Sequence, residues 1–412
     1  MTGARAGGIV LVEQYFYPDG WGGAEIPRDI AIALSRAGVR VDALCGTEQY
    51  APLTGDSTPA NPTEYGVGIV RVPRILPGAV RKLRALRIVW FCICATPILL
   101  FRRLGLIATQ TNPPLIVPTV ALVAALRRVP FIIIAQDVYP EVLFASGAAR
   151  EESLVGRCLA RLFSWAYRRA NRVVVLGSVM QRRIQAKGVA ADKIVTISNW
   201  ATGELCRHAG ADNPLRAQWS LQDRFVVLYS GNLGVGHEFD TFLQGVQLAV
   251  NRGVRLAVVF IGGGSRLAEV RTRTQGLGLT ECITFRDHVP AEELPWTMGI
   301  ADLALVTLRV GFEGLIVPSK VLGYMARGIA TLYVGPDSDI AEMIGESQCG
   351  ACCLPGTPAV VADVLARAAA DAALLRRWGE NGRAAYAARF TRELGVGRYV
   401  DLVGQLLAHG RP

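Results

Sequence analysis

The stretch RFVVLYSGNLG, residues 224–234, decides the fold of this chain. Its apolar and β-branched residues are typical of a buried strand, and the strand gives way to a loop opened by Gly231 and Asn232. A helical pattern, TFLQGVQLAVNRG, follows at 241–253. A buried strand, a glycine-containing loop and a helix in this order predict one βαβ unit of a parallel sheet.

The same rhythm runs along most of the chain and restarts once. Strand-like segments in the first half are GIVLVEQYF (8–16), VRVDALCG (39–46), LIATQ (106–110), FIIIAQD (131–137), RVVVLG (172–177) and KIVTISN (193–199). After a polar break they are VVLYSG (226–231), RLAVVFIGGG (255–264), ITFRDHV (283–289), DLALVTL (302–308) and ATLYVGP (330–336). We therefore predict two Rossmann-like α/β domains, 1–205 and 206–390, that face an interdomain cleft, and a closing helix in 391–412 that packs back on the first domain.

Composition limits the function classes. The chain has 412 residues, enough for two cores, and 51% hydrophobic with 19% charged residues argues against disorder. The net charge of +10 suits nucleic acid, anionic lipid or phosphorylated small molecules without choosing among them. Nine cysteines at irregular spacing do not form a zinc pattern, and reduced thiols are expected. The N-terminus lacks the long apolar core of a signal peptide, so we expect no export.

Several loops that follow strands could hold an anion. Glycine-rich loops let a backbone approach phosphate closely, although each could also be an ordinary turn. The candidate residues are Gly22 and Gly23 after the first strand, then Gly231, Asn232 and His237, then Gly263, then His288. Lys320 lies behind Pro318 and Ser319 in an otherwise apolar stretch, where an unpaired ammonium would be costly. One interpretation is that Lys320 binds a phosphate and Glu313 binds sugar hydroxyls. The other is that the two residues form an ordinary Glu–Lys ion pair at the surface.

The chain resembles the two-domain retaining glycosyltransferases of family GT4, which have the GT-B fold. It is most similar to the bacterial branch that builds capsular, O-antigen and exopolysaccharide repeats. The resemblance covers nearly the whole chain. It rests on QYFYPDG (14–20), QDVYPEV (136–142), VLGSVMQRRIQAKGV (175–189), ISNWA (197–201), NPLR (213–216), VVLYSGNLGVGHEFDTFL (226–243) and EGLIVPSKVLGYMARG (313–328).

The resemblance implies a glycosyltransferase that takes sugar from a UDP- or GDP-linked donor and uses no cofactor or metal. It implies catalytic roles for Asp137, Glu313 and Lys320, with the donor held mainly by the second domain. The acceptor would be a polyprenyl-diphosphate-linked saccharide in cell-surface polysaccharide synthesis. Two departures concern Gly323, where many relatives have glutamate, and Gln136, where many have histidine. A soluble acceptor, or a non-catalytic nucleotide-sugar-binding relative, is the alternative.

One segment suggests a membrane surface. Residues 79–105 place an apolar run, with Trp90 in it, between two basic groups, a layout that suits an interfacial segment and also a core helix with basic flanks. The candidate contact residues are Arg81, Lys82, Arg84, Arg87, Trp90, Arg102 and Arg103. The apolar stretches 88–101 and 104–126 are too short or too rich in proline and polar residues to span a bilayer. We expect a cytoplasmic enzyme, peripheral on the inner membrane face, that binds no nucleic acid.

Overall fold

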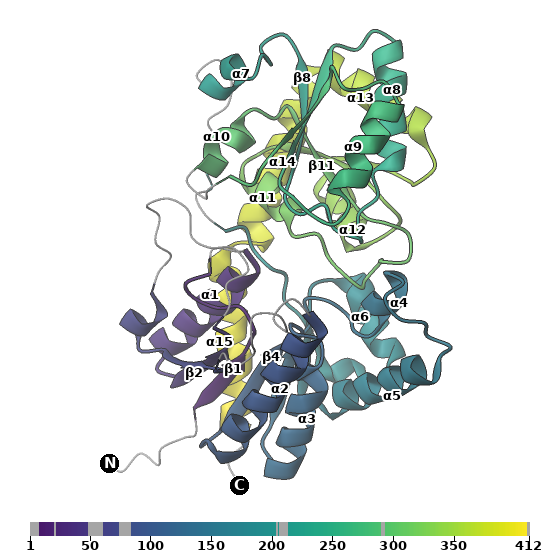
Figure 1. Cartoon of the computed structure of the whole chain (residues 1–412). Helices are drawn as coiled ribbons and strands as arrows, with labels where there is room; N and C mark the ends of the chain where they lie inside the picture. Colours follow the sequence, from purple (N-terminus) through teal and green to yellow (C-terminus); the bar gives the residue numbers. More distant parts are fainter. Residues whose placement is uncertain are drawn as a thin grey trace. The chain divides into compact units, whose positions relative to one another are not determined.

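The computed structural model describes residues 8–19, 22–47, 61–73, 84–202, 205, 213–289 and 293–409. The chain forms two compact units (Figure 1). The first comprises Met1–Ser198 together with Arg392–Pro412, and the second comprises Asn199–Thr391. The C-terminal segment of the chain therefore belongs to the same compact unit as the N-terminal residues.

The first unit is a seven-stranded parallel sheet with helices on both faces. Its strands are β1 (Ile9–Val12), β2 (Val41–Cys45), β3 (Gly68–Arg71), β4 (Leu106–Gln110), β5 (Phe131–Ile134), β6 (Arg172–Val175) and β7 (Ile194–Thr196). Its helices are α1 (Gly22–Arg36), α2 (Arg84–Phe101), α3 (Ile116–Arg127), α4 (Glu141–Ala145), α5 (Leu154–Arg169), α6 (Ser178–Ala186) and α15 (Arg392–His409), with short 3₁₀ turns at Pro62–Tyr65 and Ala191–Lys193. The strands lie in the order β3-β2-β1-β4-β5-β6-β7.

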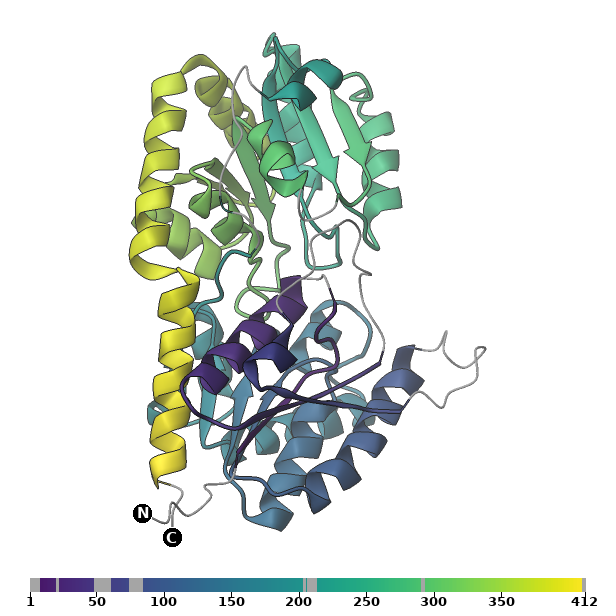
Figure 2. The ribbon, with the colours of Figure 1, turned by 90° about the vertical axis from the view of Figure 1, so that its left-hand side faces the viewer.

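The strand order of the first unit fixes where its helices lie. The chain moves from β1 to β2 through α1 and, in the opposite direction, from β4 to β5 through α3. Right-handed crossovers place these two helices on opposite faces of the sheet. α15 packs beside α1 (Figure 2), where Arg392 forms an ion pair with Asp29 at 2.9 Å, and Tyr399 is buried. α2 packs against α3, and α3 packs against α5.

The second unit is a six-stranded parallel sheet in the order β10-β9-β8-β11-β12-β13. Its strands are β8 (Phe225–Ser230), β9 (Leu256–Ile261), β10 (Ile283–Arg286), β11 (Leu303–Thr307), β12 (Ala330–Val334) and β13 (Gly350–Cys353). Its helices are α7 (Pro214–Gln218), α8 (Asp240–Asn251), α9 (Leu267–Gly276), α10 (Leu294–Gly299), α11 (Lys320–Ala326), α12 (Asp339–Ser347), α13 (Pro358–Ala370) and α14 (Ala372–Arg389). The core includes strand residues such as Val258 and Leu305 and helix residues such as Phe242 and Leu365.

The predicted fold class, two Rossmann-like parallel sheets, is confirmed, and most predicted strands lie where the pattern placed them. The first strand is shorter than its apolar run, because the chain leaves the sheet after Val12 and Glu13 begins the next loop. The pattern missed two edge strands, β3 and β13. In the described part of the chain, no helix is both long and apolar enough to cross a bilayer.

Candidate functional site

The second unit has a topological switch point between β8 and β11. From β8 the chain proceeds to β9 on one side and later returns to β11 on the other. In open parallel sheets, such a point leaves a crevice at the carboxyl ends of the strands. The loops that follow β8 and β9 meet there, and α11, which follows β11, begins with Lys320.

The two glycine-containing loops pack so closely that side chains would not fit between them. The Leu233 amide donates to the Gly263 carbonyl at 2.7 Å. A Cβ atom on Gly264 would lie 2.4 Å from the Leu233 carbonyl oxygen, and one on Gly262 would lie 2.4 Å from the Gly231 carbonyl oxygen. Both glycines have positive φ, 144° and 124°, which other residues rarely adopt. The loops therefore form a rigid edge that exposes backbone.

Lys320 places a buried amine beside this edge. Its Nζ atom lies 3.6 Å from the centre of the Tyr229 ring and has no hydrogen-bond partner among the described residues. Gly231 lies beside the same nitrogen, where a Cβ atom would be at an ordinary contact distance of 3.6 Å, and its positive φ of 129° favours glycine. Burial lowers the pKa of Lys320 well below its usual value. A buried amine without a counter-ion is suited to an anionic ligand.

His237 belongs to the same cluster as a neutral imidazole. Its Nδ1 lies 2.9 Å from the Thr307 carbonyl oxygen, so the ring donates a hydrogen bond from Nδ1. Burial, and then the nearby Lys320, lowers the pKa of His237 to about 3. The ring also meets Tyr229 edge-on, with centroids 5.8 Å apart. His237 therefore adds no charge, and its Nδ1 hydrogen bond ties the loop to Thr307 at the end of β11.

Three side chains that hold this arrangement were not predicted from the sequence. Tyr229 supplies the aromatic face under Lys320, and the hydroxyl of Tyr324 accepts a hydrogen bond from the Ser230 amide at 3.0 Å. Arg266 donates to the His237 carbonyl and forms an ion pair with Glu269. The tyrosines read as ordinary apolar core residues in the sequence. Arg266 follows the glycines of the second loop, and that position was its only signal.

The other predicted residues of the second unit are Glu313, Ser319, His288 and Asn232, and all of them lie in segments that follow strands. The Glu313 carboxylate accepts from the Gly311 amide, at 2.9 and 3.1 Å for its two oxygens. Ser319 directly precedes α11 and is exposed. His288 is exposed and follows β10, the edge strand. Asn232 is exposed, and its carbonyl accepts from the Tyr229 hydroxyl at 2.8 Å.

In the first unit, Gly22 and Gly23 begin α1, and Asp137 follows β5. The amides of Gln136 and Asp137 both donate to the Thr111 hydroxyl, at 3.2 and 3.1 Å. Thr111 itself follows β4 and is buried. The loops after two neighbouring strands are therefore joined at the carboxyl edge of this sheet.

The predicted membrane residues have mixed surroundings. Arg81 and Lys82 lie outside the described residues, and Arg84 begins α2. The Trp90 indole donates to the Pro73 carbonyl at 3.0 Å, and Arg102 forms an ion pair with Asp42 at 2.9 Å. Arg87 is partly buried, whereas Arg103 is exposed.

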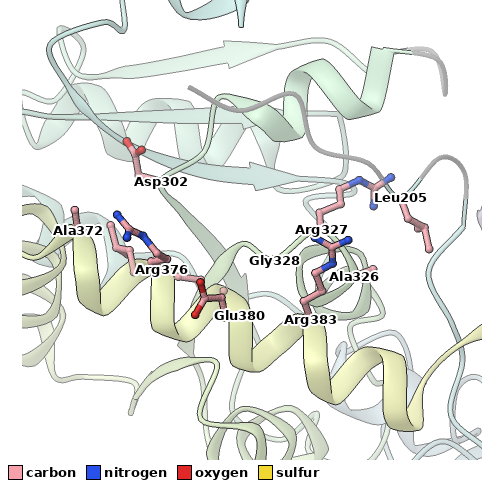
Figure 3. A pocket seen from close by; sticks show the side chains of 12 residues that line it. Leu205, Asp302, Ala326, Arg327, Gly328, Ala372, Arg376, Glu380 and Arg383 are labelled. Atoms are coloured by element: carbon pink, nitrogen blue, oxygen red, sulfur yellow. The ribbon is translucent and has the colours of Figure 1, made fainter. Parts of the chain in front are cut away.

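A groove of about 670 Å³ lies at the opposite edge of the second sheet (Figure 3). It is lined by Arg376, Glu380 and Arg383 of α14 and by Asp302 and Ala330 at the amino ends of β11 and β12. The three α14 side chains are exposed and of mixed charge, as on an ordinary solvated helix face. The glycine-containing loops and the unpartnered Lys320 amine lie at the carboxyl edge and not in this groove.

The fold and the site together define a two-domain α/β protein whose second sheet has an edge suited to binding an anion. Residues 22–200 match the model of the glycosyl transferase 4-like domain. Residues 212–385 match the model of the glycosyl transferases group 1. The chain belongs to the GT4 glycosyltransferases and has the GT-B fold, as the sequence motifs predicted.

Individual relatives agree with this family. The Pseudomonas aeruginosa protein named “Probable glycosyltransferase WbjE” is 30% identical over 268 residues, which are 64% of this chain and 66% of WbjE. WcaI of Escherichia coli K12, whose name assigns it to colanic acid biosynthesis, is 29% identical over 37% of each chain. These alignments thus span just under two thirds and just over one third of the relatives. Anabaena HepE, solved with UDP-glucose, is 15% identical with a TM-score of 0.70 over 97% of this chain and 100% of HepE.

The close packing of the two glycine loops predicts a contrast between neighbouring glycines. Gly264→Ala should lower the free energy of unfolding by about 1–3 kcal/mol, because the new side chain meets backbone and the positive φ is strained. Gly263→Ala is the matched control, since a Cβ atom there meets nothing within 4 Å. Thermal unfolding and hydrogen exchange of residues 225–237 would measure both. Equal effects of the two substitutions would contradict the close packing.

Proposed function

We propose that this protein transfers a sugar, with retention of anomeric configuration, from a nucleoside-diphosphate sugar to a lipid-linked saccharide acceptor in the synthesis of a cell-surface polysaccharide. The observation that carries the proposal is the buried Lys320 amine, which lies against the Tyr229 ring with no hydrogen-bond partner among the described residues. The names of WbjE and WcaI support the class of pathway. The UDP-glucose bound by HepE supports the class of donor.

Lys320 is suited to the leaving group of this reaction. When the bond between the anomeric carbon and the phosphate oxygen breaks, negative charge develops on the departing nucleoside diphosphate. A cation in a water-poor site stabilises that charge far more than a cation in water does. The exposed backbone of the loops after β8 and β9 can approach the same phosphates closely. Lys320 should therefore matter more in the transition state than in the ground state.

The remaining roles follow from the family resemblance. Glu313 would contact hydroxyls of the donor, and Asp137, at the carboxyl edge of the first sheet, would contact the transferred sugar or the acceptor hydroxyl. The most direct test of the reaction is nucleotide release from a panel of UDP- and GDP-sugars with a polyprenyl-diphosphate-linked acceptor. Donor hydrolysis or transfer above background supports an enzyme, whereas tight donor binding without turnover would favour a non-catalytic nucleotide-sugar-binding relative.

A membrane surface as the partner is supported by three neighbouring helices of the first unit. α2 exposes Ile93 at 57% and Phe101 at 88%, and α3 exposes Leu122 and Leu126 at 53% and 67%. On α5, Leu154, Val155 and Leu162 form a further exposed apolar stripe. Arg157 and Arg161 are exposed on the same helix. Apolar side chains with basic neighbours favour the headgroup region of an anionic bilayer. A lipid-linked acceptor would be met at such a surface.

We expect Lys320→Met to lower the transfer rate at saturating donor by about 100-fold or more, because one preorganised cation is removed from the leaving group. The variant should fold at least as stably as the wild type, since it no longer buries an amine. The lowered pKa of Lys320 makes the folded state bind fewer protons than the unfolded state, so wild-type stability should rise with pH toward 10.5, and this rise should be absent in the variant.

Lys193→Met, on the first unit, is the control for Lys320→Met, because among the described residues Lys193 donates to a backbone carbonyl, that of Arg168, and to no acidic side chain. Rates are measured by nucleotide release, and stability by thermal unfolding between pH 6 and 10. Wild-type turnover in Lys320→Met would exclude the role in leaving-group stabilisation.

We expect chelation to leave activity largely unchanged, because Lys320 supplies positive charge where other glycosyltransferases can use a metal. Among the described residues, no three His, Cys, Asp or Glu side chains lie close enough together to hold a metal ion. Turnover is compared before and after EDTA treatment, and again with Mg²⁺ or Mn²⁺ added back. An enzyme that binds donor only after a divalent metal is restored would refute this expectation.

We expect the protein to sediment with phosphatidylglycerol vesicles more than with phosphatidylcholine vesicles, and less as salt is raised, since each basic residue near an anionic surface contributes about 1 kcal/mol. Phe101→Ser/Leu126→Ser and a charge-neutral Arg81/Lys82/Arg84/Arg87 variant should each weaken the binding. Leu354→Ser, exposed at 55% on the second unit, is the matched control. Equal binding of all variants to both vesicles would rule out this surface.

A further inference from the structure

Glu13 is a buried carboxyl group at the carboxyl end of β1. It is 2% exposed, and its Oε1 atom accepts three hydrogen bonds. These come from the Gln14 amide at 3.0 Å, the Tyr15 amide at 3.4 Å and the Asn112 side-chain amide at 3.1 Å. One oxygen of the carboxyl is therefore fully engaged and its position is fixed.

The second oxygen of Glu13 has a different environment. Oε2 is buried, and among the described residues it has no hydrogen-bond partner. An ionised carboxylate would place part of its negative charge on this unsolvated atom, which is costly, whereas a protonated Oε2 carries none. The strongest influence on Glu13 is this burial, which raises its pKa well above the usual range, and the charge of Asp137 acts in the same direction.

Among the described residues, the charged groups near Glu13 make contacts of their own and form no hydrogen bond with its Oε2 atom. The Cys45 thiol, at the end of β2, has its pKa raised by burial to about 11 and so stays neutral. Arg71, at the end of β3, donates to the carbonyls of Gly46 and Tyr17, at 3.0 and 2.6 Å. The charge of Arg71 acts on the Cys45 thiol, where it opposes the effect of burial. Asp137, at the end of β5, is of like charge.

The position of Glu13 in the fold is that of a ligand-site residue. β1 and β4 are neighbours in the sheet order β3-β2-β1-β4-β5, and the chain runs away from this pair in both directions. The pair is thus the switch point of the first unit, where ligands of such sheets bind. Glu13 binds Asn112 across this point, and the adjacent Thr111 accepts from the Asp137 amide. One connected set of contacts joins the ends of β1, β4 and β5.

We propose that Glu13 is a positioning residue of the first unit's active-site edge, which carries its proton at neutral pH, fixes Asn112, and keeps a further negative charge away from the neighbouring Asp137. The inference rests on the proposed transferase function for its role in catalysis. When Glu13 ionises at high pH, a second negative charge appears beside Asp137. The arrangement of the strand-end loops, and with it the transfer rate, is then lost.

A residue that merely fills space would behave differently from a proton-carrying one. Glu13→Gln keeps the size and the acceptor oxygen for Asn112 and cannot ionise. Glu13→Leu keeps the volume and removes the acceptor, which leaves three donors unsatisfied. We expect Glu13→Leu to lose more than tenfold in kcat and Glu13→Gln to recover most of that loss.

The deciding experiment combines pH profiles with infrared spectroscopy of the full chain. Wild type should show a protonated-carboxyl band at pH 7 that is missing in Glu13→Gln and retained in Asp29→Asn, since Asp29 forms an ion pair with Arg392. Wild-type kcat should fall on the alkaline side, and Glu13→Gln should lack this fall. Because the raised pKa makes the folded state bind more protons, wild-type thermal stability should decline from pH 5 upward relative to Glu13→Gln.

The proposal is overturned if the band is the same in wild type and Glu13→Gln, if their pH profiles superimpose, or if Glu13→Gln is as inactive as Glu13→Leu. The infrared band requires no turnover. An absent band with normal transfer would therefore count against Glu13 alone. A present band without transfer from any nucleotide sugar would count against the proposed function.

Discussion

A lysine amine that is buried without a counter-ion is the constraint on which the second unit's site depends. The Nζ atom of Lys320 would be destabilising in most surroundings, and each of its neighbours limits that cost. Tyr229 presents a ring face to the amine, and His237 stays neutral. Tyr324 ties α11, which carries the lysine, to the end of β8. The second unit thus holds a buried, unpartnered amine at the edge of the sheet where a bound anion would pair with it.

Much of this arrangement could be predicted from the sequence, because strand-ending loops in a parallel sheet share one edge. The strand pattern predicted two sheets. It also placed the loops around Gly231 and Gly263 directly after strands, where a parallel sheet can bind an anion. Tyr229 and Glu13 could not be recognised, since both lie in or beside an apolar run that reads as a buried strand. Their importance comes from contacts with Lys320 and Asn112, which are far away in sequence. The edge strand β13 was missed because its sequence, GACC, is short and weakly patterned.

The two units use the same topological position for opposite chemistry. In the second unit, the switch point between β8 and β11 holds a cation beside exposed backbone. In the first unit, the switch point between β1 and β4 holds a carboxyl group and an amide, with Asp137 one strand further along. Similar sheets thus provide one edge suited to phosphate and another suited to hydroxyl groups. This division agrees with the proposed reaction, in which a nucleoside-diphosphate sugar reacts with an acceptor hydroxyl.

The return of α15 to the first unit has a consequence for how the protein is made and how it can evolve. The second unit, Asn199–Thr391, is an insertion within the first, whose last helix is encoded after it. During synthesis on the ribosome the inserted unit is therefore complete while the surrounding unit still lacks α15, although that unit was started first. Recombination that exchanges the inserted unit for that of a relative requires two crossovers, one at each junction. A single crossover would pair α1 of one parent with α15 of another. The two residues of the Asp29–Arg392 ion pair would then come from different parent proteins and would have to remain compatible.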